Sequence, residues 1–468
     1  MQIKIAIFLG KLIALISQTF KLGGGSAAPG LYSLKIDSNL VEKLIKQIPH
    51  NIVITGTNGK TTTARLLAHF ATQSGLKIIR NHTGSNLERG IASALIQNYR
   101  LHPWGVNPKF DLGIWELDEA AFNIMVPKIK PELILFLNVF RDQLDRYGEV
   151  DTVVKKWAET LKTLTPQTKV LVNGDDTNTA KLAKYFIGKV QKFGLQNYKL
   201  RGESIEKRGH NTKLDFEAKN IKLNGLKGSS FNLFLNHKSY ILNLPLPGIY
   251  HIYDTVAAIA AFTCLFTDIP IHPLRRLSEA SRYTNTLKSF LPAFGRVEKF
   301  SFQPLRLERK VEGYIFLIKN PAGATQVFET IAPQLRQNDR LLLTLNDNLA
   351  DGTDVSWIWD AEFELLLMPL SFPRKRESNK QNIYGSPIKS GMTVVCSGSR
   401  TYDLAVRLKY AGFEIKEENI EADIEKALKQ AQKGLKGRLF ILPTYTAMLE
   451  LQYILAKRGI KEDYWKKE

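Results

Sequence analysis

Cysteine is scarce in this chain, whose 468 residues contain only Cys264 and Cys396. Two cysteines can form neither a disulfide framework nor a four-cysteine zinc site, and so few of them fit a reducing cytosol best. Histidine is also missing from the last part of the sequence, since none follows His272. A nucleophilic cysteine normally needs a nearby base, so this absence bears on what Cys396 can do.

Uninterrupted apolar runs are absent from the start of the sequence, MQIKIAIFLGKLIALISQTF. Lys4 and Lys11 break this stretch, so no run reaches the roughly 18 residues of a membrane-spanning helix. A lysine ahead of an apolar stretch also fits a signal peptide. Because a phosphate-binding motif follows, we favour an amphipathic helix that lies on the domain surface or on a membrane surface.

Acidic residues are outnumbered, with 45 Asp and Glu against 65 Lys and Arg and a formal net charge of +20. This excess predicts anionic partners such as a nucleotide, pyrophosphate, an anionic lipid or a nucleic acid. The sequence has neither a zinc-finger pattern nor an RNP-like aromatic motif, so a nucleic-acid interpretation rests on charge alone. One stretch reverses the balance: residues 345–364, LNDNLADGTDVSWIWDAEFE, hold six acids and two of the six tryptophans.

The pattern of strands and helices divides the chain, which is too long for one ordinary core. We expect an N-terminal helix and Gly-rich linker over 1–45 and a central domain over 46–290 with a mostly parallel sheet covered on both faces. The polar, turn-rich segment 190–247 predicts antiparallel hairpins in or beside that sheet. A second alternating α/β domain spans 291–468, and the basic stretch 373–391 interrupts it as a surface insertion.

The strongest local motif is ITGTNGKTTT, residues 54–63. A strand runs into a glycine-bearing turn, and Lys-Thr then opens a helix whose backbone N–H groups face an anion. Lys60 can reach the β- and γ-phosphates, and Thr61 can bind Mg²⁺. The first glycine is Gly56 rather than position 54, which is Ile54, and this shorter form points away from motors and GTPases. The predicted nucleotide-binding residues here are Gly56, Thr57, Asn58, Gly59, Lys60, Thr61 and Thr62.

A second candidate element is WELDEAAF, residues 115–122, in which an apolar strand ends in acids. In an open α/β sheet this end lies beside the phosphate loop, which makes Glu116 a candidate Mg²⁺ ligand. Asp118 and Glu119 either join that site or cap the next helix. The letters LDEA also resemble a helicase Walker B segment, so a nucleic-acid motor stays open at this point.

Several segments together resemble the Mur ligases, and within them the MurT-type ligases. The N-terminal segments are TGTNGKTTT, NHTGSN (81–86), WELDEAAF, NVFRDQLDRYGE (138–149), GIYHIYDTVAAIAA (248–261) and FGRVE (294–298). The more specific C-terminal segments are KNPAGATQV (319–327), NDNLADGTDVSWIWD (346–360), SGSRTYDLAVRLKYAG (397–412) and LPTYTAMLELQYILAKRG (442–459).

The resemblance implies a Mur-type central P-loop ATPase domain followed by a Rossmann-like α/β domain. It implies that ATP and Mg²⁺ convert a carboxylate to an acyl phosphate, which ammonia then turns into an amide. The carboxylate in this family is the α-carboxyl of D-glutamate in the lipid II stem peptide. Lys60 and Glu116 would serve catalysis, Thr61 and Glu116 would hold Mg²⁺, and Lys319 and Asn320 would approach from the second domain. Asn86 and Arg296 resemble further positions near the nucleotide.

The sequence departs from the family in three places. Gln143 stands where Mur ligases commonly carry a His that binds a second Mg²⁺, as is usual for MurT-type chains. His251 and Asp254 stand where relatives carry Asn, which puts the contact with adenine in question. Segment 190–247 has no cysteine, whereas many MurT-type chains hold a four-cysteine zinc ribbon there, so we predict no zinc site.

The ammonia needs a source outside this chain. Cys396, in VVCSGSR, lies between a predicted strand and helix, but Val394 stands where a nucleophile elbow wants Gly, so we predict a buried structural thiol. The resemblance implies a heterodimer with a GatD-like class I glutamine amidotransferase, to whose Cys–His pair this chain lends an aspartate. We choose Asp354, because Asp351 precedes Gly352 in turn chemistry. Asp360 and Glu362 lie at the start of a predicted amphipathic helix, where capping explains them. Trp357 and Trp359 are either core residues or interface anchors.

The predicted function is therefore amidation of lipid II at the inner face of the plasma membrane, with peripheral membrane contact and no nucleic acid. A Mur-type or folylpolyglutamate-type ligase that adds an amino acid is the first alternative. A basic P-loop protein that acts on nucleic acid is the second.

Overall fold

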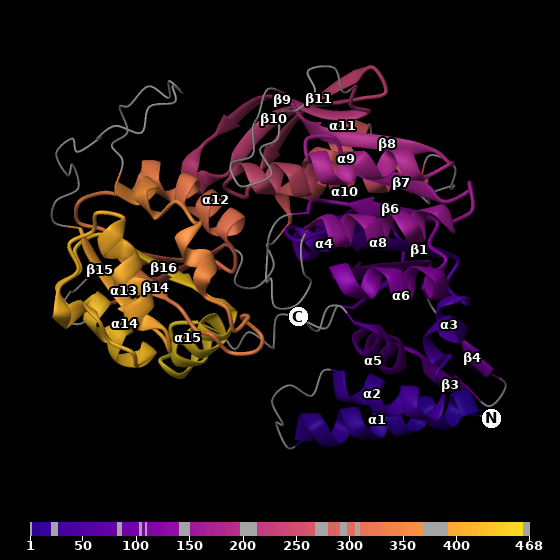
Figure 1. Cartoon of the computed structure of the whole chain (residues 1–468), viewed down its shortest axis with the longest axis horizontal. Helices are drawn as coiled ribbons and strands as arrows, with labels where there is room; N and C mark the ends of the chain where they lie inside the picture. Colours follow the sequence, from indigo (N-terminus) through magenta and orange to yellow (C-terminus); the bar gives the residue numbers. More distant parts are fainter. Residues whose placement is uncertain are drawn as a thin grey trace.

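The computed structural model describes residues 2–19, 27–81, 87–102, 105–107, 110–139, 150–196, 213–266, 279–290, 297–304, 309–367 and 392–461. Two open sheets form separate layers, one for each half of the chain (Figure 1). The strands of the two sheets lie on either side of residue 290, and we propose a domain boundary near it. The insertion 373–391 and Gln143 lie outside the described residues.

Within the described residues, the larger sheet has nine strands in the order β11-β10-β9-β8-β7-β6-β1-β5-β2. All pairs from β2 to β9 are parallel, and only β9-β10 and β10-β11 are antiparallel. The predicted mostly parallel sheet is thus confirmed. The bounds are β1 His50–Thr55, β2 Ile78–Arg80, β5 Leu112–Leu117, β6 Leu133–Phe136, β7 Lys169–Asn173, β8 Val190–Leu195, β9 Phe216–Leu223, β10 Ser229–Leu235 and β11 Lys238–Leu244.

Antiparallel hairpins edge this sheet, as expected, but they start later than residue 190. β8 still pairs in parallel with β7 and β9, so the change of direction comes only after β9. The alternation of buried and half-exposed residues along β10 fits a strand with one face on the core. Segment 190–247 therefore contains two strands that continue the parallel part of the sheet, β8 and β9, before the chain reverses direction. A separate small hairpin pairs β3 (Arg100–His102) with β4 (Gly105–Asn107).

Helices cover both faces of the large sheet. One face packs against α4, α10 and α11, and the other against α3, α5, α6, α8 and α9. Helices α2 and α3 fall where a linker was expected over 1–45. The bounds are α1 Gln2–Thr19, α2 Ala28–Ile36, α3 Leu40–Ile45, α4 Lys60–Gln73, α5 Glu88–Asn98, α6 Glu119–Ile129, α8 Val150–Lys162, α9 Thr177–Leu182, α10 Ile249–Phe266 and α11 Glu279–Lys288.

Helix α10 is the one described helix that is long and apolar enough to cross a membrane. However, 89% of its apolar window is buried inside the domain. It packs along α4 and the neighbouring strands, so its hydrophobicity is explained by its place in the core.

The second sheet has five strands in the order β12-β13-β16-β14-β15, all parallel except β12. Helix α12 and the 3₁₀ helices η6 and η7 pack with α13 on one face, and α14 and α15 on the other. The bounds are β12 Glu298–Phe302, β13 Val311–Ile315, β14 Arg340–Thr344, β15 Thr393–Ser397, β16 Leu439–Pro443, α12 Pro321–Ile331, α13 Thr401–Tyr410, α14 Ile424–Gln432, α15 Tyr445–Lys457, η6 Ser356–Trp359 and η7 Phe363–Leu367.

Candidate nucleotide-binding and ligase site

The phosphate loop joins the buried strand β1 to helix α4. Gly56 and Gly59 both have positive φ, at 139° and 86°, which favours glycine at these turns. A Cβ on Gly59 would also lie 2.2 Å from Asp254 Oδ1. Lys60 opens the helix and its ammonium donates to the carbonyls of Gly56 and Thr57. The loop therefore presents a helix N-terminus and one flexible cation at the carboxyl edge of the sheet.

Asn138, which follows β6, holds this loop from the neighbouring strand. Its side chain accepts a hydrogen bond from the Asn58 amide at 2.8 Å and donates to the Asn58 carbonyl at 3.1 Å. Its backbone carbonyl accepts from the Thr57 amide at 3.0 Å. Asn138 begins the segment 138–149 that resembles Mur ligases, but no role was predicted for it. Its position after a parallel strand at the same edge was the available signal.

Glu116 and Thr61 meet at the end of β5, as the sequence predicted. The Thr61 hydroxyl donates to the Glu116 carboxylate at 2.9 Å, and Glu116 is 2% exposed. Asn81, at the end of the adjacent strand β2, binds both backbone groups of Glu116 at 2.8 Å and fixes its position. Asp118 caps α6 by accepting from the Ala121 amide at 2.7 Å, which is one of the two roles the sequence left open for it.

This pair of oxygen donors fits a magnesium ion. Mg²⁺ usually takes one or two protein oxygens and completes its shell with substrate phosphates and water. A buried carboxylate and a hydroxyl in contact beside a phosphate loop meet that need. Among the described residues no group of three or more His, Cys, Asp or Glu side chains could hold a metal ion.

The second domain reaches the phosphate loop through Lys319 and Asn320, which follow β13. Asn320 and Asn58 exchange two amide hydrogen bonds of 3.0 and 3.3 Å, and Lys319 Nζ donates to the Thr57 carbonyl at 3.3 Å. Asn320 is 1% exposed and also caps α12 by accepting from the Gly323 amide. The expected approach of these two residues is therefore present in the structure.

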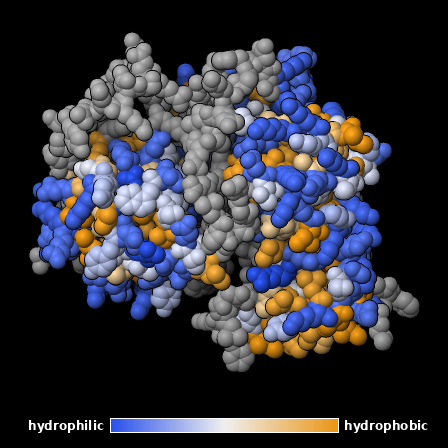
Figure 2. Space-filling view, viewed as in Figure 1, coloured by the Kyte–Doolittle hydropathy of each residue, from blue (hydrophilic) through white to orange (hydrophobic). Residues whose placement is uncertain are grey.

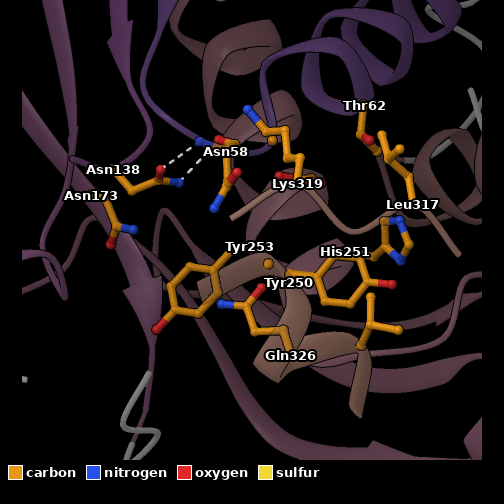
Figure 3. A pocket seen from close by; sticks show the side chains of 14 residues that line it. Asn58, Thr62, Asn138, Asn173, Tyr250, His251, Tyr253, Leu317, Lys319 and Gln326 are labelled. Atoms are coloured by element: carbon orange, nitrogen blue, oxygen red, sulfur yellow. Dashed lines mark hydrogen bonds between the residues drawn. The ribbon is translucent and has the colours of Figure 1, made fainter. Parts of the chain in front are cut away.

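A pocket lies between the phosphate loop, α10 and α12 (Figure 3). Tyr250 and His251 form one side of it, and Gln326 and Lys319 come from the second domain. His251 donates from Nδ1 to the Pro247 carbonyl at 2.7 Å, which fixes its tautomer. The remaining lining residues are Asn58, Gly59, Thr62, Asn138, Asn173, Tyr253, Asp254, Leu317, Gly323 and Val327.

Asp254, one of the departures from the family pattern, lies under the start of α4. Its carboxylate accepts from the Thr63 hydroxyl at 3.4 Å and is 6% exposed. Asp254 therefore supports the phosphate loop where it enters α4, and it also lines the pocket. Asn86 and Arg296, the two other predicted nucleotide-binding residues, lie outside the described residues.

The acidic stretch after β14 forms a loop that is held by hydrogen bonds and leads into two short 3₁₀ helices. The sequence predicted a longer helix here, and that prediction is wrong. Asp351 is buried and accepts from the Thr446 amide at 2.8 Å and from its hydroxyl. Burial raises the pKa of Asp351 above its ordinary value. Asp354 is exposed, and its Oδ1 accepts from the Ser356 amide at 2.8 Å. Asp351 thus shapes the loop, and Asp354 faces outward.

The two tryptophans of this stretch have different environments. Trp357 is 7% exposed and belongs to the core of the second domain, whereas Trp359 is 50% exposed. Trp359 contacts Tyr410 edge-on at 5.4 Å and lies 5.7 Å from the Arg407 guanidinium. Trp357 is therefore a core residue, whereas for Trp359 a role as an interface anchor stays a prediction.

Family models match both halves of the chain. The Mur ligase middle domain covers residues 54–262, and the MurT ligase C-terminal domain covers residues 317–372 and 385–448. The chain is 30% identical over 471 residues to a protein of Staphylococcus aureus (strain COL) named lipid II isoglutaminyl synthase (glutamine-hydrolyzing) subunit MurT, with 95% of each chain covered. The chain belongs to the MurT-type Mur ligases.

Solved structures agree on the fold of this Mur-type chain. MurF from Acinetobacter baumannii is 16% identical with a TM-score of 0.64, covering 92% of this chain and 81% of its own. Mycobacterium tuberculosis folylpolyglutamate synthase, solved with ADP and AMPPCP, is 13% identical with a TM-score of 0.60, covering 91% and 96%. The predicted fold class, family and enzyme class, an ATP-dependent ligase, are confirmed.

Cys396 is a structural thiol of this Mur-type chain, as the sequence predicted. It is 0% exposed in β15, and burial raises its pKa to about 12; burial likewise raises the pKa of Cys264 to about 12. Because a thiol with that pKa stays protonated, we expect native protein to resist iodoacetamide from pH 7 to 9. Intact-mass spectrometry would measure this, with urea-unfolded protein as the control that takes up two labels. Rapid labelling of the native chain would contradict the assignment.

Proposed function

We propose that this chain is the ATP-using subunit of a lipid II isoglutaminyl synthase. It amidates the α-carboxylate of D-glutamate in the lipid II stem peptide and takes ammonia from a separate glutaminase. The observation that carries the proposal is the likeness to the Staphylococcus aureus subunit over 95% of both chains, since that likeness spans the phosphate loop and the second domain together.

The phosphate loop would position the nucleotide. The N-terminus of α4 would face the β- and γ-phosphates, and Lys60 would leave the carbonyls of Gly56 and Thr57 to neutralise charge on the phosphates. Thr61 and Glu116 would hold Mg²⁺, which supplies further positive charge at the phosphates when bound. The pocket beside Tyr250 and His251 offers aromatic surface to the adenine.

The reaction then proceeds through two nucleophilic substitutions. An oxygen of the substrate carboxylate attacks the γ-phosphorus, the bond to the β-phosphate oxygen breaks, and ADP leaves. Ammonia attacks the acyl carbon, loses a proton, and phosphate leaves with the former carboxylate oxygen. Lys319 and Asn320 close over the phosphate loop, which supports a site that keeps water away from the acyl phosphate.

The ammonia would come from a GatD-like class I glutamine amidotransferase in a heterodimer. Asp354 is the aspartate proposed to orient the partner's histidine. Its loop is held to the start of α15, because Asp351 accepts from the Thr446 amide and the Asn348 side chain donates to the Thr446 hydroxyl. Asp351 itself is buried and already accepts hydrogen bonds from Thr446, so it is poorly placed to accept one from the partner's histidine. Of the three aspartates considered, Asp354 and Asp360 are exposed.

Exposed aromatic residues beside this loop support a partner-binding surface. Tyr402, Val406 and Tyr410 recur at helical spacing along α13 and are all exposed, and Trp359 packs against Tyr410. Large aromatic side chains with an arginine nearby are typical anchors of protein interfaces. Arg407, between them, is held by the carbonyls of Ile358 and Ala361. This surface would place the partner within reach of Asp354.

An amidation assay tests the function. The purified chain receives ATP, Mg²⁺, lipid II and ammonium, and mass spectrometry follows the product. We expect the loss of about one dalton that replaces a hydroxyl by an amine. A product heavier by an amino acid would instead favour the Mur-type or folylpolyglutamate-type alternative. No product with ammonium would refute the proposal, and ATP hydrolysis stimulated only by nucleic acid would favour the remaining alternative.

A further inference from the structure

Helix α1 exposes an apolar face that the fold does not use. Its inner side packs on the domain through Ala6, Ile7 and Gly10, which are buried. Its outer side carries large apolar side chains at i, i+3 and i+7 spacing, the pattern of a single helix face. Phe8 and Leu15 are 63% and 62% exposed, and the same face includes Ile5, Leu12 and Ile16. The helix is thus apolar on both sides although it lies at the surface.

The neighbouring helix α2 extends this face. Leu31 and Tyr32 are both exposed on α2, which packs directly along α1. In the space-filling view the apolar colour gathers over α1 and α2 at the lower end of the first domain (Figure 2). We call the exposed apolar residues of the two helices the α1–α2 face. Its residues are Ile5, Phe8, Leu12, Leu15, Ile16, Leu31 and Tyr32.

Close packing fixes the α1–α2 face to the domain. The Ser33 hydroxyl donates to the Ala6 carbonyl at 2.8 Å, and a Cβ on Gly10 would come within 2.5 Å of that hydroxyl. The Gly30 amide donates to the Ser93 hydroxyl of α5 at 2.9 Å, and a Cβ on Gly30 would lie 2.0 Å from the Arg89 carbonyl. The two helices therefore form a built platform rather than a loosely attached tail.

The charge around the α1–α2 face is basic. Neither α1 nor α2 contains an acidic residue, and Lys4 and Lys11 share one flank of α1 at heptad spacing. On α2, Lys35 is exposed and its ammonium lies 5.4 Å from the Tyr32 ring centroid. The acid that follows α2, Asp37, is buried and paired with Lys43 at 2.8 Å. An apolar surface rimmed by lysines matches the interface of an anionic bilayer.

We infer that the α1–α2 face docks the enzyme in the plane of an anionic membrane. Helix α1 is not among the helices long and apolar enough to span a bilayer, so it would lie in the headgroup region with its outer side chains in the acyl boundary. The role of this docking rests on the proposed function, because a lipid-linked substrate would then be met at the surface that carries it. A second copy of this chain and the glutaminase are the competing occupants.

Vesicle flotation tests the docking directly. The full-length chain is mixed with vesicles of phosphatidylglycerol and phosphatidylcholine in equal parts, or of phosphatidylcholine alone. We expect binding to the anionic vesicles, a loss of about tenfold or more in Phe8→Glu/Leu15→Glu, and about fivefold weaker binding for each of Lys4→Gln and Lys11→Gln. The matched control is Ile241→Glu, an apolar residue 71% exposed on the edge strand β11, which should bind like the parent.

Two further measurements separate the outcomes. Thermal unfolding should give the same midpoint for the double variant and the parent, because the replaced side chains are exposed. Amidation should fall for lipid II in vesicles and persist for a substrate without the polyprenyl tail. If neither substrate is amidated by the parent, the proposed function fails while flotation still decides the docking. The inference is overturned if the parent does not float with anionic vesicles, or if the double variant floats as well as the parent. It is also overturned if the parent is a dimer in solution and the double variant is a monomer.

Discussion

Replacing Lys60 with alanine is expected to lower the turnover of ATP-dependent amidation by about 10²–10³-fold, with ammonium or with glutamine as the nitrogen source. Lys60 is the cation at the N-terminus of α4, and its ammonium now rests on the Gly56 and Thr57 carbonyls. Without it, the charge that develops on the transferred phosphoryl group loses a preorganised partner. Mass spectrometry of lipid II with ammonium at saturating concentration measures the loss.

The control for this prediction is Lys77→Ala. Lys77 follows the same helix but its side chain is exposed, so turnover should stay at the parent level. Thermal unfolding should show that Lys60→Ala remains folded, because the two carbonyls it releases lie in a loop held by Asn138. Normal turnover in folded Lys60→Ala would place the phosphates elsewhere.

Replacing Asp354 with asparagine is expected to separate the two nitrogen sources. Glutamine-dependent amidation by the heterodimer should fall by about 10³–10⁴-fold, the scale seen when the aspartate of a triad becomes an amide, while ammonium-dependent amidation stays intact. Asp354 is exposed, and it is not among the residues that line the pocket beside the phosphate loop. Parallel assays with glutamine and with ammonium on the same preparation measure the split.

Asp360→Asn is the matched control, since Asp360 is also exposed and follows η6 on the same stretch. It should leave both activities unchanged if Asp354 is the lent carboxylate. If Asp360→Asn abolishes the glutamine reaction and Asp354→Asn does not, the assignment moves to Asp360. An equal loss of both activities in Asp354→Asn would show that Asp354 serves the ligase site or the fold.

The sequence predicted those parts of the site that local rules determine. Lys60 and Thr61 follow from a strand, a glycine turn and a helix start, and Glu116 follows because the ends of parallel strands share an edge. The meeting of Lys319 with the phosphate loop was expected from the resemblance to Mur ligases, since no local rule joins residues so far apart in the chain.

The other features of the site depend on tertiary packing, which could not be predicted from the sequence. Asp254 supports Gly59 and Thr63 only because α10 crosses beneath α4. Trp357 and Trp359 lie two positions apart with similar surroundings in the sequence, yet the short 3₁₀ turn buries one and exposes the other. The sequence predicted a helix of regular period in this stretch, but the structure has a hydrogen-bonded loop and short 3₁₀ helices there.

In the proposed reaction, ATP drives amide formation by phosphorylating the substrate carboxylate. Lipid II whose D-glutamate α-carboxylate carries ¹⁸O tests it most directly, with ATP and ammonium as the other substrates and the released nucleotide and phosphate analysed by mass spectrometry. We predict one ¹⁸O atom in inorganic phosphate for each amide formed, and ADP as the nucleotide product. Unlabelled phosphate alongside amidated product, or label in AMP, would contradict it.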